Sequence, residues 1–254
     1  GVTGDVAGFA AATYMRGVRF VPLPTTVLAM TDASVGGKTG VDLPQGKNLV
    51  GAFKQPECVL IDPAVLHTLP AEEFRSGMAE VIKHGVRGDP MLFDALAKGM
   101  EDEALSLDPV LLARSIRVKI EVVESDPFEG GRRVVLNLGH TAGHALERLS
   151  GYTLRHGEGV SIGMVVAARI SERLGRAAAG LSDRIVDGLR AWGLPVRCPS
   201  YSADAILVAM THDKKKRRGR LRWILPLAIG EVEIASDVPR RTVREVLIEM
   251  GATE

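Results

Sequence analysis

Apolar residues recur at helical spacing over most of the chain after about residue 69. This period of three to four residues indicates amphipathic helices, each with one face turned toward a core. The pattern predicts helices at Ala71–Lys83, Pro90–Lys98, Val110–Glu124, Thr141–Leu149, Gly159–Leu174, Asp183–Trp192 and Thr242–Met250. A hairpin is predicted from Leu221–Leu225 and Glu231–Ile234, around a turn at Ile229-Gly230. We therefore expect a mostly helical domain here.

The pattern before residue 68 is different and is typical of an α/β domain. Small residues over Gly4–Arg16 predict a helix, and the short apolar runs Arg19–Val21 and Val59–Ile61 predict strands. We place the boundary near residues 66–69. Residues 1–67 are then the end of an α/β domain, and residues 68–254 are the helical domain.

The composition is that of an ordinary globular chain, with 46% apolar and 25% charged residues. Lys and Arg number 32 against 31 Asp and Glu, and this balance argues against a nucleic-acid or acidic-membrane binder. Two cysteines, Cys58 and Cys198, exclude a disulfide framework and a cysteine-based zinc finger. Apolar runs are too short to cross a bilayer and no secretory signal is visible, so a cytoplasmic setting is expected.

Two glycine-rich segments are candidates for ligand binding. The chain starts at Gly1 rather than Met, and residues 1–8 lead into a helix, where backbone N–H groups and the helix dipole favour a phosphate. Close helix packing through the glycines explains this pattern equally well. Further on, Gly37-Lys38-Thr39 suggests a P-loop, but Asp32 stands where that motif needs glycine. This stretch and Lys47-Asn48 suit a phosphorylated, hydroxyl-rich ligand, or form a solvated surface loop.

Histidines and one glutamate form the strongest candidate site. His140 and His144 lie four residues apart on one helical face, and His156 follows twelve residues later. Glu80 stands among apolar residues, where a buried carboxylate needs a metal or a partner such as Lys83. Together Glu80, His140 and His156 would make a zinc site with one position open for substrate. Hydrogen-bonded core histidines are the competing interpretation.

A basic run at residues 213–220 has three interpretations. Such a run is usually a solvated loop. The balanced net charge and the scarcity of aromatic residues weaken the second interpretation, a nucleic-acid patch. The third is that one lysine reaches a substrate anion.

Seven segments, taken in order, resemble those of 3-dehydroquinate synthases, in the sugar-phosphate cyclase superfamily. They are Gly1–Gly8, Pro24–Thr26, Asp32–Gly40, Gly46–Phe53, Ala79–Lys83, Asn137–His140 and His156–Glu158. The resemblance implies that residues 1–67 are the C-terminal part of a Rossmann-like NAD-binding domain, followed by a helical metal- and substrate-binding domain at 68–254. Family members carry further strands before the glycine turn, so we expect an N-terminally truncated member. Whether the chain as written binds NAD or is active alone stays open.

The resemblance implies roles for individual residues. Glu80, His140 and His156 match the ligands of Zn²⁺ or Co²⁺. The residues that match the NAD site are Gly1, Val2, Asp5, Thr25, Thr26, Thr68, Leu69 and Glu73. Those that match the substrate site are Lys83, Lys119, Arg133, Asn137, His144 and one of Lys214 and Lys215. Asp32, Lys38, Lys47 and Asn48 match positions around both, and Arg16 matches a residue that the neighbouring subunit of a homodimer contributes.

The implied activity is that of a phosphate-eliminating lyase of the shikimate pathway, which leads to chorismate and the aromatic amino acids. It converts 3-deoxy-D-arabino-heptulosonate 7-phosphate to 3-dehydroquinate and phosphate. NAD transiently oxidises a ring hydroxyl, phosphate is eliminated, the ketone is reduced again, and an intramolecular aldol step closes the carbocycle. The implied partners are this small sugar-acid phosphate and a second copy of the chain, with no nucleic acid and no membrane.

Three alternatives remain. A sister sugar-phosphate cyclase would use the same fold and metal site, although Lys119, Arg133 and Asn137 favour the dehydroquinate reaction. An NAD-dependent metal polyol dehydrogenase would release NADH stoichiometrically. A zinc-stabilised helical domain would bind metal without releasing phosphate. For His144, phosphate binding is preferred over a role as proton carrier.

Overall fold

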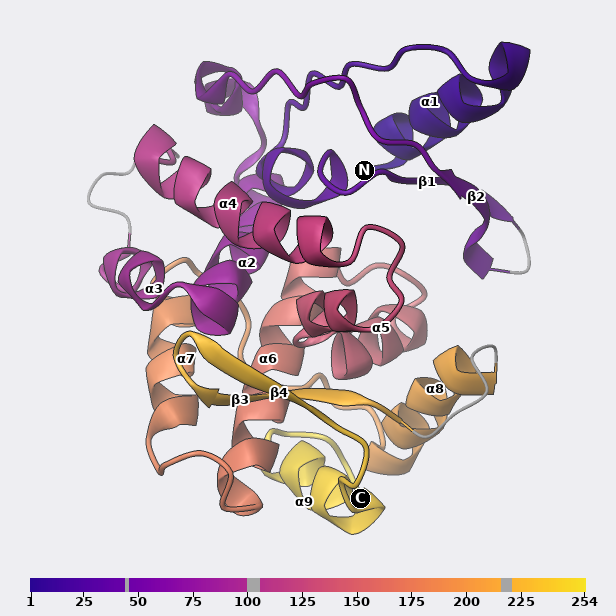
Figure 1. The fold of residues 1–254 in the computed structure, drawn as a ribbon. Helices are drawn as coiled ribbons and strands as arrows, with labels where there is room; N and C mark the ends of the chain where they lie inside the picture. Colours follow the sequence, from indigo (N-terminus) through magenta and orange to yellow (C-terminus); the bar gives the residue numbers. More distant parts are fainter. Residues whose placement is uncertain (44–45, 100–105, 216–220) are drawn as a thin grey trace. The chain divides into compact units, whose positions relative to one another are not determined.

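The computed structural model of the protein describes residues 1–43, 46–99, 106–215 and 221–254. The chain forms two compact units (Figure 1). One consists of Gly1–Gly77 and Asp102–Arg133, and the other of Met78–Glu101 and Val134–Glu254. The division falls inside helix α2 (Ala71–Gly88). The domain boundary at residue 67 stays a prediction.

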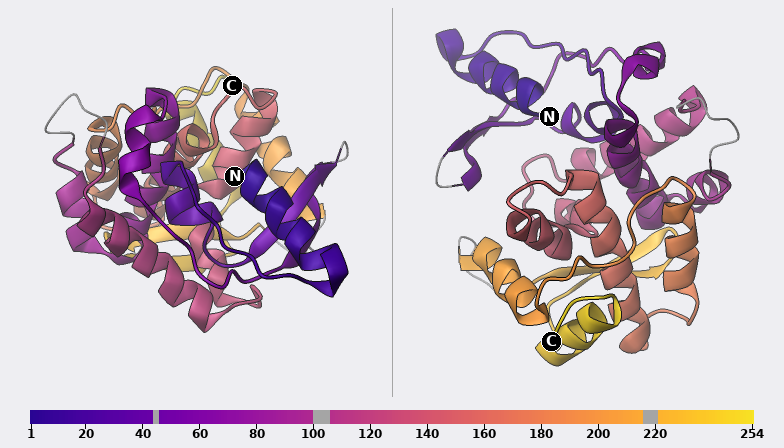
Figure 2. Two further views of the ribbon diagram at one scale, coloured as in Figure 1. Left: turned by 90° about the horizontal axis from the view of Figure 1, so that it is seen from above. Right: turned by 180° about the vertical axis from the view of Figure 1, so that it is seen from behind.

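A helix and a hairpin begin the first unit. Helix α1 (Val2–Thr13) packs against strand β1 (Lys38–Leu43), which pairs antiparallel with β2 (Gly46–Phe53) (Figures 1 and 2). Gly8 permits this packing, because a Cβ at Gly8 would collide with the side chain of Thr39. Close packing therefore accounts for this glycine of the N-terminal segment.

The strands predicted at Arg19–Val21 and Val59–Ile61 are not formed, so that prediction is wrong. The two segments run as irregular chain, and backbone hydrogen bonds of 2.9 and 3.0 Å join their neighbourhoods. Pro22 and Pro24 lack the N–H that a continuing ladder needs, which explains why the pairing stops. Within the described part of the first unit, the β structure is instead the unpredicted β1–β2 hairpin.

Helix α4 (Pro109–Ser125) confirms the helix predicted at 110–124. It starts at a proline, and the carboxylate of Asp108 accepts the backbone N–H of Val110 at 2.6 Å. Helix α4 contacts η2 (Ala29–Ala33), a short π-helix. The other short elements of this unit are the 3₁₀ helices η1 (Tyr14–Arg16) and η3 (Pro63–Thr68).

Helix α6 (His156–Arg173) is the central element of the second unit (Figure 1). Thirteen of its 18 residues are buried, and all thirteen are small or apolar. Helix α5 (His140–Leu149), α7 (Leu181–Arg190) and the strand β3 (Trp223–Ala228) contact it. Its buried Ser171 hydroxyl donates to a β3 carbonyl at 2.6 Å, so the polar group is satisfied inside the core.

The remaining elements complete the second unit. They are α3 (Pro90–Leu96), η4 (Arg132–Asn137, which crosses into this unit), α8 (Ala203–Lys215), β4 (Glu231–Ala235) and α9 (Arg240–Glu249). The seven helices predicted after residue 69, the helix predicted at Gly4–Arg16 and the predicted β3–β4 hairpin are confirmed, with ends shifted by a few residues, whereas α8 was not predicted. Among the described residues, no helix is both long and apolar enough to span a bilayer.

Candidate active site

Three helices of the second unit carry the glutamate and the two histidines that the sequence proposes as metal ligands. Glu80 lies in the middle of α2 and is fully buried. His140 and His156 are the first residues of α5 and α6. A helix start holds a side chain at a defined point on the scaffold, and rigid elements position ligands more precisely than loops do.

Glycines set the distance between α5 and α6. A Cβ placed on Gly143 would lie 2.8 Å from the carbonyl group of Gly159, so the two backbones touch at this point. A second contact lies four residues after Gly159 in α6 and four residues before Gly143, where a Cβ on Gly163 would collide with the carbonyl of Gly139. Gly139 itself has φ 82°, a conformation that favours glycine, and it turns the chain into α5. This glycine contact determines how close His140 and His156 come.

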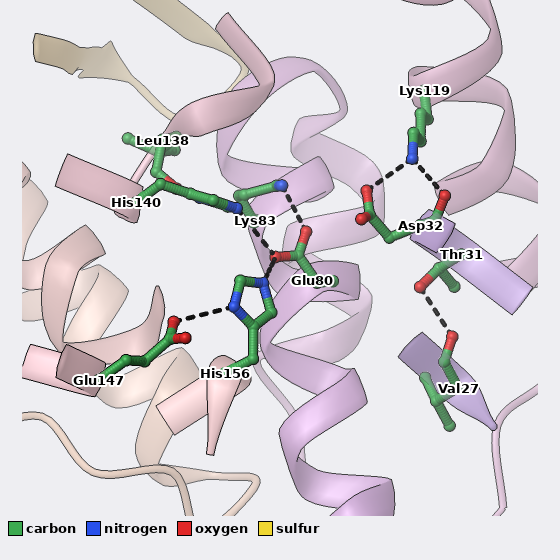
Figure 3. A network of polar contacts seen from close by, with 10 residues as sticks. All are labelled: Val27, Thr31, Asp32, Glu80, Lys83, Lys119, Leu138, His140, Glu147 and His156. Carbon is green, nitrogen blue, oxygen red and sulfur yellow. Dashed lines mark hydrogen bonds and ion pairs between the residues drawn. The ribbon is translucent and has the colours of Figure 1, made fainter. Parts of the chain in front are cut away.

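The donor atoms of the three residues converge (Figure 3). Nε2 of His140 lies 3.7 Å from Oε1 of Glu80, and Nε2 of His156 lies 3.4 Å from the same oxygen. One donor atom from each residue falls within 4.8 Å of the other two, close enough to surround one ion. The three residues thus meet in space, and their role as ligands is a proposal.

The other ring nitrogen of each histidine faces an acceptor. Nδ1 of His140 lies 3.0 Å from the carbonyl oxygen of Leu138, and Nδ1 of His156 lies 3.0 Å from Oε1 of Glu147. Carbonyl and carboxylate oxygens only accept hydrogen bonds, so each Nδ1 carries the proton. In the neutral rings, both Nε2 lone pairs therefore point toward Glu80, as metal coordination requires.

The charges in this cluster favour a cation beside Glu80. Burial raises the pKa of the Glu80 carboxyl, but Lys83, His156 and His140 outweigh burial and hold that pKa well below its usual range. Burial, helped by Lys83, lowers the pKa of His140 well below its ordinary value. Burial also acts to lower the pKa of His156, but the carboxylates of Glu147 and Glu80 outweigh burial and raise this pKa to about 10. A positive charge is thus stabilised at Nε2 of His156, and a proton or a metal ion can supply it.

The donor set fits a divalent metal. Glu80 is an ionised, fully buried carboxylate, and neither of its oxygens accepts a hydrogen bond of good geometry from the described residues. Two neutral imidazoles and one carboxylate are a common set for zinc sites that keep a coordination position open for substrate. His140 is half-buried and His156 is about 29% exposed at its side chain, so the cluster is not sealed.

Lys83 and His144 adjoin this cluster. The ammonium group of Lys83, which is 1% exposed, forms an ion pair with Oε2 of Glu80. The ring centroid of His144 lies 5.1 Å from that of His140, and His144 is exposed. Asn137, half-buried at the end of η4, precedes the cluster in the same unit. The structure therefore places three proposed substrate residues in the same unit as the proposed ligands.

Lys119 and Asp32 form an ion pair in the first unit. Nζ of Lys119 lies 2.7 Å from Oδ1 of Asp32 and also donates to the Asp32 carbonyl oxygen (Figure 3). Lys119 is almost completely buried, whereas Asp32 is partly exposed. The charge of Lys119 is thus compensated by Asp32, and the predicted role of both residues toward substrate stays a proposal.

Arg133 also acts within the first unit. Its guanidinium donates to the carbonyls of Gly36 and Pro127, at 2.9 and 2.8 Å. Burial lowers the pKa of Arg133 from its ordinary value. Nearby, Nζ of Lys38 lies 2.7 Å from the carboxylate of Glu129. These two cations therefore connect the turn before β1 and the start of β1 with the loop that follows α4.

The residues assigned to NAD are spread over several elements of the first unit. Gly1 is the N-cap of α1, and Asp5, in its first turn, has a pKa raised by burial. The other residues assigned to NAD are exposed or half-buried, and they are Val2, Thr25, Thr26, Thr68, Leu69 and Glu73. The Thr26 hydroxyl accepts the backbone N–H of Ala29 at 3.1 Å, which is a structural contact. Their cofactor roles stay predictions.

Several predicted residues stay untested. The backbones of Lys47 and Asn48 lie in β2, and those of Lys214 and Lys215 lie at the end of α8. Their side chains lie outside the described part of the structure. Arg16 ends η1 with an exposed side chain and a φ of 66°. Its predicted role toward a second subunit is likewise a proposal.

Glu147 was not singled out from the sequence, although the structure places it against His156. It is 5% exposed, and it lies seven residues after His140 in α5. Residues spaced by seven share a helix face, so this spacing was visible in the sequence. The partner of Glu147, His156, could not be predicted from the sequence, because the two residues are brought together by the tertiary contact between α5 and α6.

Comparisons with known proteins identify the family of the chain. The family model described as 3-dehydroquinate synthase N-terminal matches residues 1–76, and the one described as 3-dehydroquinate synthase C-terminal matches residues 77–216. The 3-dehydroquinate synthase of Microcystis aeruginosa is 51% identical over 253 residues, covering 97% of this chain and 69% of that protein. The chain belongs to the 3-dehydroquinate synthase family.

Solved structures similar to this 3-dehydroquinate synthase family member include sugar-phosphate cyclases. The 2-epi-5-epi-valiolone synthase ValA of Streptomyces hygroscopicus, with NAD⁺ and Zn²⁺ bound, has a TM-score of 0.87 at 30% identity. That match covers 97% of this chain and 70% of ValA. A 2-deoxy-scyllo-inosose synthase complexed with carbaglucose-6-phosphate, NAD⁺ and Co²⁺ has a TM-score of 0.84 at 28% identity, covering 98% and 71%. The fold is therefore that of the dehydroquinate synthase-like cyclases.

Proposed function

We propose that the chain catalyses the 3-dehydroquinate synthase reaction, in which 3-deoxy-D-arabino-heptulosonate 7-phosphate becomes 3-dehydroquinate and phosphate. The observation that carries this proposal is the 51% identity to a 3-dehydroquinate synthase over 97% of the chain. The structurally similar valiolone and inosose synthases are only 30% and 28% identical, which favours this reaction over that of a sister cyclase.

Glu80, His140 and His156 would hold the Zn²⁺ or Co²⁺ ion. The ion, when bound, would polarise substrate hydroxyls and lower their pKa. The support for this assignment is the convergence of the two Nε2 atoms on the buried carboxylate. Lys83, paired with Oε2 of Glu80, would keep that carboxylate ionised and leave Oε1 on the side of the histidines.

Cationic and polar groups would bind the anions of the substrate. Lys83 and His144 adjoin the ligand cluster, and Asn137 offers an amide that can donate and accept. Charge-assisted hydrogen bonds to phosphate or carboxylate are short and strong, so such groups fix the orientation of a doubly anionic substrate. This positioning lowers the entropic cost of an intramolecular proton transfer to the departing phosphate.

NAD would be bound by residues of the first unit. Bound NAD would supply a temporary acceptor of hydride that is restored within each turnover. In the first turn of α1, which follows its N-cap Gly1, backbone N–H groups such as that of Val2 lack an intrahelical acceptor and would suit a pyrophosphate. We also propose that residues 1–67 belong to a Rossmann-like domain, that the protein acts in the cytoplasm as a homodimer, and that Arg16 serves the neighbouring subunit.

The test is an assay of phosphate release from the heptulosonate phosphate with NAD and Zn²⁺ or Co²⁺, with NADH absorbance followed in parallel. The proposal predicts phosphate and 3-dehydroquinate in equal amounts, with no accumulation of NADH. Accumulating NADH would indicate a polyol dehydrogenase. Metal binding without phosphate release would indicate a metal-stabilised domain without this activity. A parallel reaction offers a sugar phosphate that lacks the carboxylate. Phosphate release from that substrate instead would indicate a sister cyclase.

A further inference from the structure

The imidazole of His156 lies between two buried carboxylates (Figure 3). Its Nε2 faces Oε1 of Glu80 at 3.4 Å, and its Nδ1 faces Oε1 of Glu147 at 3.0 Å. Glu80 is fully buried, and Glu147 is 5% exposed. Burial of a carboxylate is costly unless a charged or donating partner compensates it. The Nδ1–H of His156 is a compensating donor for Glu147.

Packing fixes the side chain of Glu147 in this position. A Cβ placed on Gly159 would lie 3.3 Å from Cγ of Glu147, so the glutamate stem runs directly over α6. Gly159 lies three residues after His156, within the first turn of the same helix. A larger residue at position 159 would displace the carboxylate from the ring. The bond between Glu147 and His156 is therefore built into the contact of α5 with α6.

We propose that Glu147 is a positioning residue for the metal site, setting the affinity of the ion through the orientation and basicity of His156. This inference rests on the proposed function, because it needs an ion at Glu80, His140 and His156. A carboxylate on Nδ1–H fixes the tautomer, so that Nε2 always presents its lone pair to the ion. It also withdraws the Nδ1 proton partially, which makes Nε2 a stronger donor.

The contact of His140 provides an internal comparison. Its Nδ1 faces the neutral carbonyl of Leu138 at the same distance of 3.0 Å. A carbonyl fixes the tautomer as well, but it adds no negative charge. The two histidines therefore differ in donor strength, and His156 is the stronger ligand. Substitution of Glu147 weakens the ligand that contributes more.

Metal affinity measured on graded variants tests this role. Glu147→Gln keeps an acceptor oxygen without the charge, and Glu147→Leu removes the acceptor. Loss of such a partner typically weakens metal binding by about 10- to 100-fold, so we expect about tenfold for Gln and about 100-fold for Leu. The dissociation constant of Zn²⁺ is measured by competition with a chromogenic chelator on the full chain. The visible spectrum of the Co²⁺-loaded protein reports the ligand geometry.

A matched control removes the same charge nearby. The control is Glu158→Gln. Glu158 lies two residues after His156, and its carboxylate accepts the backbone N–H of Arg155 rather than bonding to the ring. Because a partly exposed charge that does not bond to the ring contributes little, we expect the affinity of this variant to change by less than about twofold. A general electrostatic effect would weaken both glutamine variants alike and would overturn the proposal.

The outcomes separate this inference from the proposed function. The positioning role is supported if the wild-type protein binds the metal and Glu147→Gln binds it more weakly, with an altered Co²⁺ spectrum. Wild-type affinity and an unchanged spectrum in Glu147→Gln overturn it and leave the metal site intact. A wild-type chain that binds no metal overturns both. Should Glu147→Leu not fold, the comparison of the two glutamine variants still decides.

Discussion

Addition of one methyl group at Gly143 should separate the two helices that carry His140 and His156. A Cβ at Gly143 lies 2.8 Å from the carbonyl carbon and oxygen of Gly159 and 3.1 Å from the nitrogen of Val160. These are backbone atoms, which cannot rotate away as the end of a side chain can. In Gly143→Ala, α5 and α6 must therefore move apart.

The required movement can be read from the contact. Ordinary van der Waals contact for a Cβ begins at 3.4 Å, so a distance of 2.8 Å demands a shift of about 0.6 Å. A functional site must be held to within about 0.5 Å, so this shift is enough to disturb it. We expect metal affinity to fall at least about tenfold. Overpacking costs about 1–3 kcal/mol, and the better helix propensity of alanine returns about 1 kcal/mol.

Chelator competition and denaturant unfolding measure the two effects separately. Gly4→Ala is the matched control, because it adds the same methyl to a helical glycine with nothing within 4 Å. That control should bind metal as the wild type does and should unfold at equal or slightly higher denaturant concentration. If Gly143→Ala holds metal as tightly as the wild type, the glycine contact does not set the ligand geometry and the reasoning is refuted.

Three further predictions concern groups elsewhere. Lys83→Met leaves Glu80 without its ammonium partner, so metal-free protein should lose about 3–5 kcal/mol in urea unfolding and metal-loaded protein distinctly less; equal losses would contradict this. Backbone N–H groups hold the pKa of Asp126 below its ordinary value of 3.8, so the ionised carboxylate adds to the free energy of unfolding above that pH, and this contribution is lost as the pH falls through the lowered pKa. In denaturant unfolding, the stability difference between the wild type and Asp126→Asn should therefore be smaller at pH 3 than at pH 7. Burial raises the pKa of Cys198 to about 11, so a thiol reagent at pH 8 should label exposed Cys58 first, and mass spectrometry of the peptides checks the order.

The helical part of the fold could be predicted because its signal is local. Amphipathic spacing marked seven helices, with ends near those observed. The β1–β2 hairpin was missed because its strands contain glycines, and Gly40 even pairs with Gly51, which lowers the strand propensity. Helix α8 was missed because its apolar residues 205–210 form a nearly continuous run without a clear helical period.

The candidate site could be predicted only as far as residue type and spacing carry it. His140 and His156 stood out as part of a cluster, and Glu80 stood out as a carboxylate in apolar company. The role of Glu147 could not be seen, because an acidic residue on an amphipathic helix usually faces solvent. Its burial against His156 depends on the tertiary contact between two helices. Asp126 was missed too, although its three backbone N–H donors lie only four to seven residues further along the chain.

The most direct test is the metal content of purified protein after loading with Zn²⁺ and dialysis, measured by elemental analysis. Three donors with one open position predict about one ion per chain in the wild type. In His140→Ala the ion should be lost while the helical circular dichroism is kept, because little core volume is removed. Full zinc occupancy in His140→Ala would contradict the account, since the ion would then be held by other residues.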